Sequence, residues 1–318
     1  MIVVTGGAGF IGSNLVWELN KKGHRDVLVV DNLSDARKYR NLVGADIADY
    51  VDKEDFLTRV TNRAGWLGDV EAVFHQGACT STTETDGRYM MKNNYDYSKA
   101  ILDLCLERRV PLIYASSAAV YGGGTVFGED PTNEAPLNVY GFSKLLFDVH
   151  VRGLLEAAES QIVGLRYFNV YGPREAHKGP MASMVLQLDD QVEATGKARL
   201  FGATEGYEAG EQRRDFIYVG DVVDVNLWFF DNPDRSGIFN CGTGTSRTFN
   251  DLAGEVVRFR GQGEIDYIPF PEALQGRYQS YTEADMSKLR SAGYAAAPTS
   301  LEEGIPEYLA WRREQIDE

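Results

Sequence analysis

The chain has 318 residues, of which 43% are apolar and 25% are charged, and its formal net charge is −15. These values are ordinary for one large globular domain or two closely packed ones. The negative charge argues against nucleic acid or an anionic membrane as a partner, although local Arg or Lys residues can still hold a small anion. No apolar run reaches the length of a membrane span. The three cysteines and four histidines lack metal-binding spacing, so we expect a cytoplasmic protein without a metal site.

The first segment is typical of a dinucleotide-binding βα unit. Apolar residues 2–5 predict a buried strand, and Gly7, Gly9 and Gly12 follow it directly, before an amphipathic helix over 13–22. The first glycine of such a motif permits a tight turn, the second lets the backbone approach a pyrophosphate, and the third lets helix and strand pack closely. Because glycines also form ordinary turns, the motif gains weight only from this order of elements.

Strands and helices continue to alternate through the first half of the chain. The second strand ends in Asp31, 19 residues after Gly12, where a ribose-binding carboxylate is expected. The predicted strands are residues 2–5, 27–31, 71–75, 111–116 and 162–166. The predicted helices are residues 13–22, 53–63, 89–108 and 140–158. Alternation of this kind predicts an α/β fold with a doubly wound parallel (Rossmann) sheet that binds its ligand at the carboxyl ends of the strands.

The pattern changes after residue 170. A helix is expected near 181–195, and residues 202–214 are polar and rich in glycine. The apolar stretches 215–219 and 238–239 have the character of strands that rejoin the first domain. The predicted dinucleotide-binding domain is therefore residues 1–170 with about 215–245. The predicted substrate domain, a smaller C-terminal α/β unit, is residues 171–214 and 246–318.

Two serines and a Tyr-x-x-x-Lys pair form the second chemical motif. Ser116 and Ser117 end a predicted strand, and Tyr140 and Lys144 share one face of a predicted helix. A nearby ammonium lowers the pKa of a phenol, and a serine hydroxyl can hold the substrate oxygen beside it. The same spacing occurs at Tyr95, but that residue lies inside a helical pattern where packing is the better explanation. The motif indicates proton transfer beside a nicotinamide ring, at a carbon that bears a hydroxyl.

The chain resembles the nucleotide-sugar group of the extended short-chain dehydrogenases/reductases. Four segments are in register with that group, namely residues 5–12, 116–122, 140–144 and 166–173. In this alignment Ser117 takes the place of the catalytic serine because it precedes Ala-Ala-Val-Tyr-Gly, and Ser116 has a structural role. The resemblance implies transient oxidation of a sugar carbon by a bound nicotinamide cofactor.

Within the group, the resemblance is closest to the ADP-L-glycero-D-manno-heptose 6-epimerases, over nearly the whole chain apart from a longer insert near 205–212. The matching segments are residues 30–33, 48–56, 77–84, 89–94, 136–140, 171–179 and 276–278. That family inverts carbon 6 of an ADP-linked heptose for the lipopolysaccharide inner core, by oxidation to a ketone and return of the hydride. The resemblance implies that Tyr140 and Lys178 are the two acid/base groups and that Ser117 and Lys144 complete the catalytic set. From the residues alone, His177 competes with Lys178, because its unperturbed pKa suits proton transfer.

The resemblance also implies the contacts of cofactor and substrate. The implied cofactor residues are Gly6, Gly7, Gly9, Phe10, Ile11, Gly12, Asp31, Asn32, Lys38, Lys53, Gln76, Gly77, Ala78, Cys79, Thr80, Asn93, Lys144, Val170 and Lys178. The implied ADP-sugar residues are Asn169, Pro180, Gln187, Phe201, Gly202, Ala203, Thr204, Arg214 and Tyr278. Pro180 and Gln187 replace a Ser and a His of the family pattern, and residues 202–204 also differ, which leaves the sugar contacts open.

The choice between NADP and NAD depends on residues with opposite effects. Asp31 favours NAD because a carboxylate repels a 2′-phosphate, whereas Arg37, Lys38 and Lys53 could neutralise that phosphate. The family has matching lysines and binds NADP, so we expect one tightly bound NADP per subunit, with NAD as the alternative. By the same resemblance we expect a homo-oligomer, a pentamer, with an ADP-sugar substrate.

Three other functions share some of these sequence features. A UDP- or GDP-hexose 4-epimerase shares the Ser-Tyr-Lys trio, but Lys178 and the segment 79–83 argue against it. A 4,6-dehydratase usually has an Asp-Glu pair after its catalytic Ser or Thr, where this chain has Ala118 and Ala119. A non-catalytic NADP-binding regulator is opposed by the intact Tyr-x-x-x-Lys pair at Tyr140.

Overall fold

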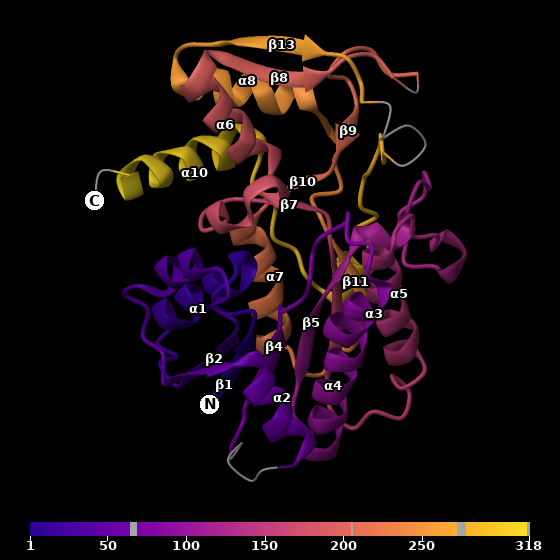
Figure 1. Ribbon diagram of the computed structural model, residues 1–318. Helices are drawn as coiled ribbons and strands as arrows, with labels where there is room; N and C mark the ends of the chain where they lie inside the picture. The colour runs from indigo at the N-terminus through magenta and orange to yellow at the C-terminus, as the bar shows by residue number, and fades with distance from the viewer. Residues whose placement is uncertain (64–68, 205, 272–277, 317–318) are drawn as a thin grey trace.

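The computed structural model describes residues 1–63, 69–204, 206–271 and 278–316. Its main sheet has seven parallel strands in the order β11-β6-β5-β4-β1-β2-β3 (Figure 1). These strands are β1 (Ile2–Thr5), β2 (Val27–Asp31), β3 (Asp49–Asp52), β4 (Ala72–His75), β5 (Leu112–Ser117), β6 (Ile162–Tyr167) and β11 (Gly237–Cys241). The predicted doubly wound sheet is confirmed. Its strand order reverses between β1 and β4, which is where ligands bind in folds of this kind.

Helices cover both faces of the sheet, and β1 contributes to the apolar core on each side. Val4 packs in the cluster that contains Leu15 of α1, whereas Val3 packs in the cluster that contains Phe56 of α2. The helices of the first face are α1 (Phe10–Lys21) and α7 (Val219–Asp231). The helices of the second face are α2 (Lys53–Thr61), α4 (Tyr97–Arg108) and α5 (Val139–Arg152). Burial on both faces explains why the central strands are almost continuously apolar.

A second group of elements lies at one end of the sheet, in the upper part of Figure 1. Its strand pairs are β8 (Lys197–Phe201) with β13 (Glu264–Ile268), and β9 (Arg213–Arg214) with β12 (Arg247–Thr248). Its helices are α6 (Met184–Thr195), α8 (Phe249–Arg260) and α10 (Leu301–Ile316). They share an apolar cluster that includes Val185, Leu252 and Leu309. The predicted smaller α/β unit is therefore present.

Two strands from the second half of the chain pair with different parts of the structure. β10 (Phe216–Tyr218) pairs with β7 (Asn169–Tyr171) outside the main sheet, whereas β11 joins the sheet beside β6. In addition, α9 (Ser287–Ala292) brings Leu289 into the core cluster beneath the sheet. The division of the chain into two domains with the boundaries given above stays a prediction.

Several elements differ in extent from the prediction. The helix predicted over 89–108 is three helical pieces: α3 (Gly87–Met90), the π-helical turn η2 (Met91–Asp96) and α4. The helix predicted over 140–158 ends at Arg152, before a series of turns. β3 was not predicted, because Val51 is its one fully buried residue and the strand therefore lacks an apolar run. Among the described residues, no helix has the length and apolar character needed to cross a bilayer.

Candidate active site

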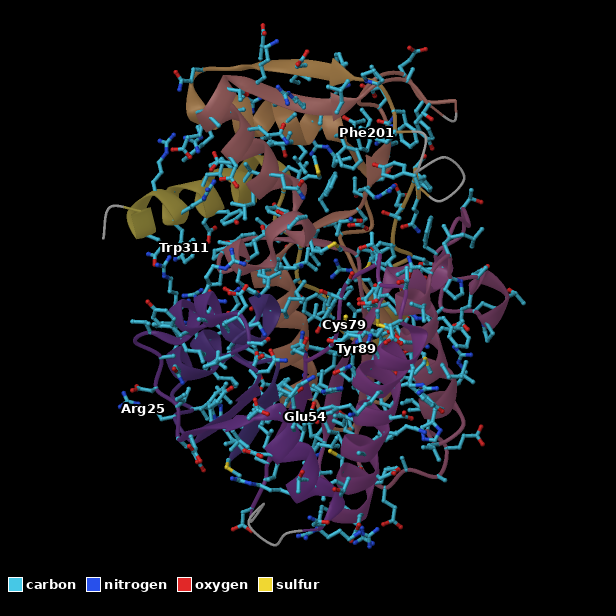
Figure 2. All side chains as sticks on the ribbon, in the orientation of Figure 1. Arg25, Glu54, Cys79, Tyr89, Phe201 and Trp311 are labelled. Carbon is cyan, nitrogen blue, oxygen red and sulfur yellow. The ribbon has the colours of Figure 1, made fainter. Side chains whose placement is uncertain are left out.

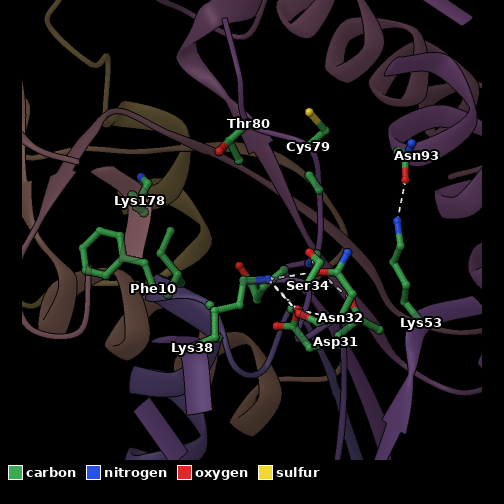
Figure 3. A pocket seen from close by; sticks show the side chains of 18 of the residues that line it. Phe10, Asp31, Asn32, Ser34, Lys38, Lys53, Cys79, Thr80, Asn93 and Lys178 are labelled. Atoms are coloured by element: carbon green, nitrogen blue, oxygen red, sulfur yellow. Dashed lines mark hydrogen bonds and ion pairs between the residues drawn. The ribbon is translucent and has the colours of Figure 1, made fainter. Parts of the chain in front are cut away.

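A cavity of about 430 Å³ lies at the carboxyl ends of β1, β2 and β4 (Figure 3). It is lined by the segments that follow these three strands and by the loop that carries Lys178. The predicted cofactor residues in its lining are Gly6, Gly9, Phe10, Ile11, Gly12, Asp31, Asn32, Lys38, Lys53, Gln76, Gly77, Ala78, Cys79, Thr80, Asn93 and Lys178. The structure therefore gathers residues from positions 6 to 178 around one cavity at the point where the strand order reverses.

The glycine loop between β1 and α1 leaves no room for side chains where it approaches the helix. A Cβ atom at Gly12 would lie 2.1 Å from the carbonyl oxygen of Gly6. Gly6 itself has a φ of +67° and faces the backbone of Gly77. The first N–H groups of α1 have no partner within the helix and point toward the loop. This arrangement fits a pyrophosphate, which the helix N-terminus can bind.

The carboxylate of Asp31 is held by donors on both of its oxygens. One oxygen accepts from the Lys38 ammonium at 2.8 Å and from the Asn32 N–H at 2.7 Å, and the other accepts from the Ala8 N–H at 2.9 Å. Figure 3 shows Lys38 extended over Asp31 and Asn32 inside the cavity. Asp31 thus ties the glycine loop to the end of β2, and its negative charge is neutralised by Lys38.

On the opposite side of the cavity in Figure 3, Lys53 at the start of α2 donates to the side chain of Asn93 at 2.6 Å. Asn93 lies in the π-helical turn η2, as does its neighbour Asn94. The Asn94 side chain accepts from the Cys79 N–H at 2.8 Å and donates to the Cys79 carbonyl at 2.9 Å. The π turn therefore fixes the segment after β4 against the cavity, as π turns often do at functional sites.

Some predicted cofactor residues lie outside the cavity lining, and some lining residues were not predicted. Within the glycine loop, Gly7 packs against β1. Val170 is half-buried in β7, and Lys144 is buried on α5. The lining residues that were not assigned to the cofactor are Thr5, Val30, Ser34, Ser81, Tyr89, Tyr97, His177 and Met181. Thr5, Val30, Ser34 and Ser81 lie at or just beyond predicted strand ends, which is the signal that could have found them.

Tyr140 and Ser117 meet beside this cavity. Burial raises the pKa of Tyr140, and a hydrogen bond with the Ser117 hydroxyl partly offsets that effect. Cys79 connects the two regions, because it lines the cavity and also adds to the effect of burial in raising the pKa of Tyr140 and of Tyr89, whose label lies beside that of Cys79 in Figure 2. The neighbouring Ser116 instead donates to the buried carboxylate of Asp148 at 2.9 Å. Of the two serines, Ser117 is thus the one that interacts with Tyr140.

Lys144 lies one helical turn after Tyr140 and is 5% exposed. Its ammonium donates to the carbonyl oxygen of Ala115 in β5 at 2.7 Å. Burial lowers the pKa of Lys144 to about 8, against the opposing effect of the Asp148 carboxylate. At pH 7 most of the molecules therefore carry a positive charge at this position.

Lys178 and His177 lie on η5 (Ala176–Met181), at the edge of the cavity. The Lys178 ammonium lies 5.3 Å from the centre of the Phe10 ring, and burial lowers its pKa. Burial and the nearby Lys38 and Lys178 lower the pKa of His177 to about 4. His177 is therefore neutral and weakly basic at pH 7.

The predicted ADP-sugar residues fall into two groups. Phe201, Arg214 and Tyr278 are in contact: the Phe201 and Tyr278 rings are 5.9 Å apart, and the Arg214 guanidinium lies 5.0 Å from the Tyr278 ring. Phe270, which was not predicted, packs against both rings. The segment of Gly202, Ala203 and Thr204 follows Phe201 directly. In the second group, Gln187 donates to the Pro180 carbonyl at 3.3 Å, and Asn169 is exposed on β7.

Residues 2–242 of the chain match the NAD dependent epimerase/dehydratase family. The chain belongs to this family. The family description agrees with the glycine loop and the cavity, which fit a nicotinamide dinucleotide. The prediction of a nicotinamide cofactor is confirmed at this level.

Two proteins similar to this chain are ADP-heptose epimerases. An ADP-L-glycero-D-manno-heptose-6-epimerase of Alkalilimnicola ehrlichii is 59% identical over 309 residues, 97% of this chain and 96% of the relative. The crystal structure of the Helicobacter pylori ADP-L-glycero-D-manno-heptose-6-epimerase is 33% identical with a TM-score of 0.82, and the match covers 98% of this chain and 96% of that one. The predicted resemblance to these epimerases is confirmed.

The fold is shared more widely. The UDP-glucose 4-epimerase of Thermotoga maritima, solved with UDP-glucose, is 30% identical with a TM-score of 0.83, and the match covers 99% of both chains. Similar folds thus serve epimerases of other nucleotide sugars, so the fold alone does not choose the substrate.

Proposed function

We propose that this protein inverts carbon 6 of the heptose in ADP-D-glycero-D-manno-heptose and so forms the L-glycero epimer for lipopolysaccharide synthesis. The observation that carries the proposal is the 59% identity, over nearly all of both chains, to a relative of that activity. The position of Lys178 supports it, because inversion needs a second proton-transfer group and Lys178 reaches the same cavity as the cofactor loop.

In this proposal the glycine loop and the cavity lining would hold a nicotinamide cofactor, which would supply reversible hydride transfer at carbon 6. Tyr140 takes the proton of the carbon-6 hydroxyl, while the Ser117 hydroxyl, already bonded to Tyr140, holds that oxygen in place. Lys144 remains charged near pH 7 and favours the phenolate form. Lys178 then gives a proton to the oxygen of the inverted centre. No net oxidation results, so the cofactor need not leave.

For the cofactor we propose NADP, one per subunit, rather than NAD. The Asp31 carboxylate would repel a 2′-phosphate, but Lys38 lies 2.8 Å from it and cancels its charge. Lys53 supplies a further cation in the lining of the cavity. We further propose a cytoplasmic homo-oligomer, a pentamer, and an ADP-sugar contact made by Phe201, Arg214 and Tyr278.

The test is proton NMR of the purified protein with ADP-D-glycero-D-manno-heptose and no added cofactor. Appearance of the L-glycero epimer is the expected result, and mass spectrometry of the denatured extract then distinguishes NADP from NAD. No conversion by a sample that contains bound cofactor would refute the heptose substrate. UDP- and GDP-hexoses would then be the next substrates, since a 4-epimerase shares the Ser-Tyr-Lys trio.

A further inference from the structure

The loop from Gly172 to Ser183 carries Lys178, and one buried carboxylate holds both of its ends. Glu175 is 0% exposed. One of its oxygens accepts from the Gly172 N–H at 3.4 Å and from the Ser183 hydroxyl at 2.6 Å, and the other accepts from the Ser183 N–H at 2.6 Å. Burial raises the pKa of the Glu175 carboxyl, and the hydrogen bonds from Ser183 and Gly172 offset part of that effect, because backbone N–H groups can only donate and so favour the ionised form. Glu175 therefore bridges the start of the loop and the N-cap of α6.

The same loop is anchored to other elements on either side. Tyr308 of α10 is buried close to Glu175, whose negative charge adds to the effect of burial in raising the pKa of the phenol. The guanidinium of Arg174 lies 4.9 Å from the Trp17 ring of α1 and 5.4 Å from the Trp311 ring of α10. Arg174 also has a φ of +72°, a conformation that a non-glycine residue keeps only when its surroundings hold it. The base of the loop is thus fixed between α1 and α10, and η5 projects from it.

Lys178 is joined to Glu175 in two ways. Its backbone N–H donates to the Glu175 carbonyl at 2.9 Å, which sets the first turn of η5. Its ammonium is partly desolvated against the uncharged ring of Phe10, which lowers its pKa, and the negative charge of Glu175 acts in the opposite direction. His177, on the same loop, is neutral at pH 7. Glu175 is the carboxylate that favours the charged form of Lys178.

We propose that Glu175 is the positioning residue for Lys178, fixing the loop that presents the ammonium to the cavity and keeping that ammonium protonated. The inference rests on the proposed function, in which Lys178 is the second acid/base. When the L-glycero epimer forms, one proton passes from the substrate hydroxyl to the Tyr140 phenolate, and one passes from the Lys178 ammonium to the ketone oxygen. Lys178 must therefore be charged before each turnover in this direction.

The experiment is the pH dependence of kcat for formation of the L-glycero epimer by wild type and Glu175→Gln, both with bound cofactor. Loss of the charge should move the basic limb of the profile down by about one pH unit, because an opposite charge nearby shifts a pKa by roughly one to three units. We also expect kcat at the optimum to fall between about 10-fold and 100-fold, since the loop loses its bridge. A basic limb that coincides with that of wild type would overturn the proposal.

Ser183→Ala is the matched control. It removes one donor to Glu175 but leaves the carboxylate, so it should lower kcat without moving the basic limb. If only the loop geometry mattered, the two variants would have the same pH profile. An equal shift of the basic limb in both variants would therefore also overturn the proposal. If Glu175→Gln does not fold, Glu175→Asp decides: it keeps the charge but is one methylene too short to reach both ends of the loop. Wild-type kcat for Glu175→Asp would refute the positioning role.

Failure of the two proposals can be told apart. If wild type does not convert the ADP-heptose, the proposed function falls and the role of Glu175 falls with it. If wild type converts the substrate and the basic limb of Glu175→Gln is unmoved, the role of Glu175 alone is refuted.

Discussion

Replacing Asp148 by Asn should destabilise the protein by about 3 kcal/mol or more. The Asp148 side chain is 0% exposed and accepts hydrogen bonds at 2.9 Å from each of Arg166, Ser116 and Tyr114. Arg166 is also 0% exposed, so the variant leaves a buried guanidinium with one fewer anion. Removing one partner of a buried ion pair costs roughly 3–5 kcal/mol. We expect the lower end of that range, because Arg166 keeps its ion pair with Glu134.

Arg152→Gln is the matched control. Arg152 pairs with Glu134 at 2.5 Å, but its side chain is 32% exposed. The Glu134 side chain is 4% exposed, but it keeps its ion pair with Arg166 when Arg152 is replaced, and the lost guanidinium is partly exposed, so this variant should cost about 1 kcal/mol or less. The two substitutions lie on the same helix and remove one charge each from the same network. The difference between the free energies of unfolding of the two variants therefore measures the effect of burying the charge that is lost.

The assay is urea unfolding at 25 °C, followed by tryptophan fluorescence, with cofactor at the same saturating concentration throughout. For a slope of about 3 kcal/mol per M of urea, Asp148→Asn should lower the midpoint by about 1 M. Arg152→Gln should lower it by about 0.3 M or less. A midpoint for Asp148→Asn within 0.3 M (a limit of about 1 kcal/mol) of wild type, or no lower than that of Arg152→Gln, would refute the reasoning.

Three further predictions concern the site and its surroundings. Tyr140→Phe should keep its cofactor and lose about 1,000-fold in kcat, measured by NMR, since a positioned acid/base contributes roughly 100- to 10,000-fold. Lys38→Ala should weaken NADP binding about 10-fold or more but leave NAD binding nearly unchanged, because a hydrogen bond to a charged group contributes about 1.5–3 kcal/mol; equal losses for both cofactors would contradict a 2′-phosphate contact. His75 is buried between the Thr5 and Ser98 hydroxyls, and its pKa is lowered to about 3 in the folded protein. As the pH falls, the unfolded chain therefore takes up a proton on His75 at a higher pH than the folded protein does. Stability should thus fall as pH drops from about 6.5 toward 3, and urea midpoints of His75→Gln should fall less steeply over that range.

The parts of the fold that could be predicted from sequence are those with local signals. The strand 27–31 is observed as β2 with the same bounds, because its first four residues form a clear apolar run. The neighbouring β3 has a mixed pattern, and only its pairing with β2 stabilises it as a strand. The π turn η2 could not be predicted from the sequence either. A 3.6-residue apolar period predicts an ordinary α-helix and gives no sign of the wider turn around Asn94.

The cofactor cavity was predictable for a similar reason. Its lining follows strand ends, and Lys38 lies only seven residues after the Asp31 that it neutralises. The environment of Lys178 was not predictable, because the bridging role of Glu175 depends on where the chain turns between Gly172 and Ser183. The catalytic roles given to Tyr140, Ser117, Lys144 and Lys178 stay predictions, although the structure places Ser117 in contact with Tyr140.

One face of α5 connects the proposed chemistry to the stability of the fold. Tyr140, Lys144, Asp148 and Arg152 follow one another at intervals of four residues, so they form a row along the helix. The row begins at the phenol beside the cavity and ends at a half-exposed arginine, and between them Asp148 both favours the charge of Lys144 and binds the buried Arg166. A carboxylate that only stabilised the core could lie at any buried position near Arg166. Its place one turn from Lys144 means that the same buried charge holds the sheet to α5 and favours the charged form of Lys144.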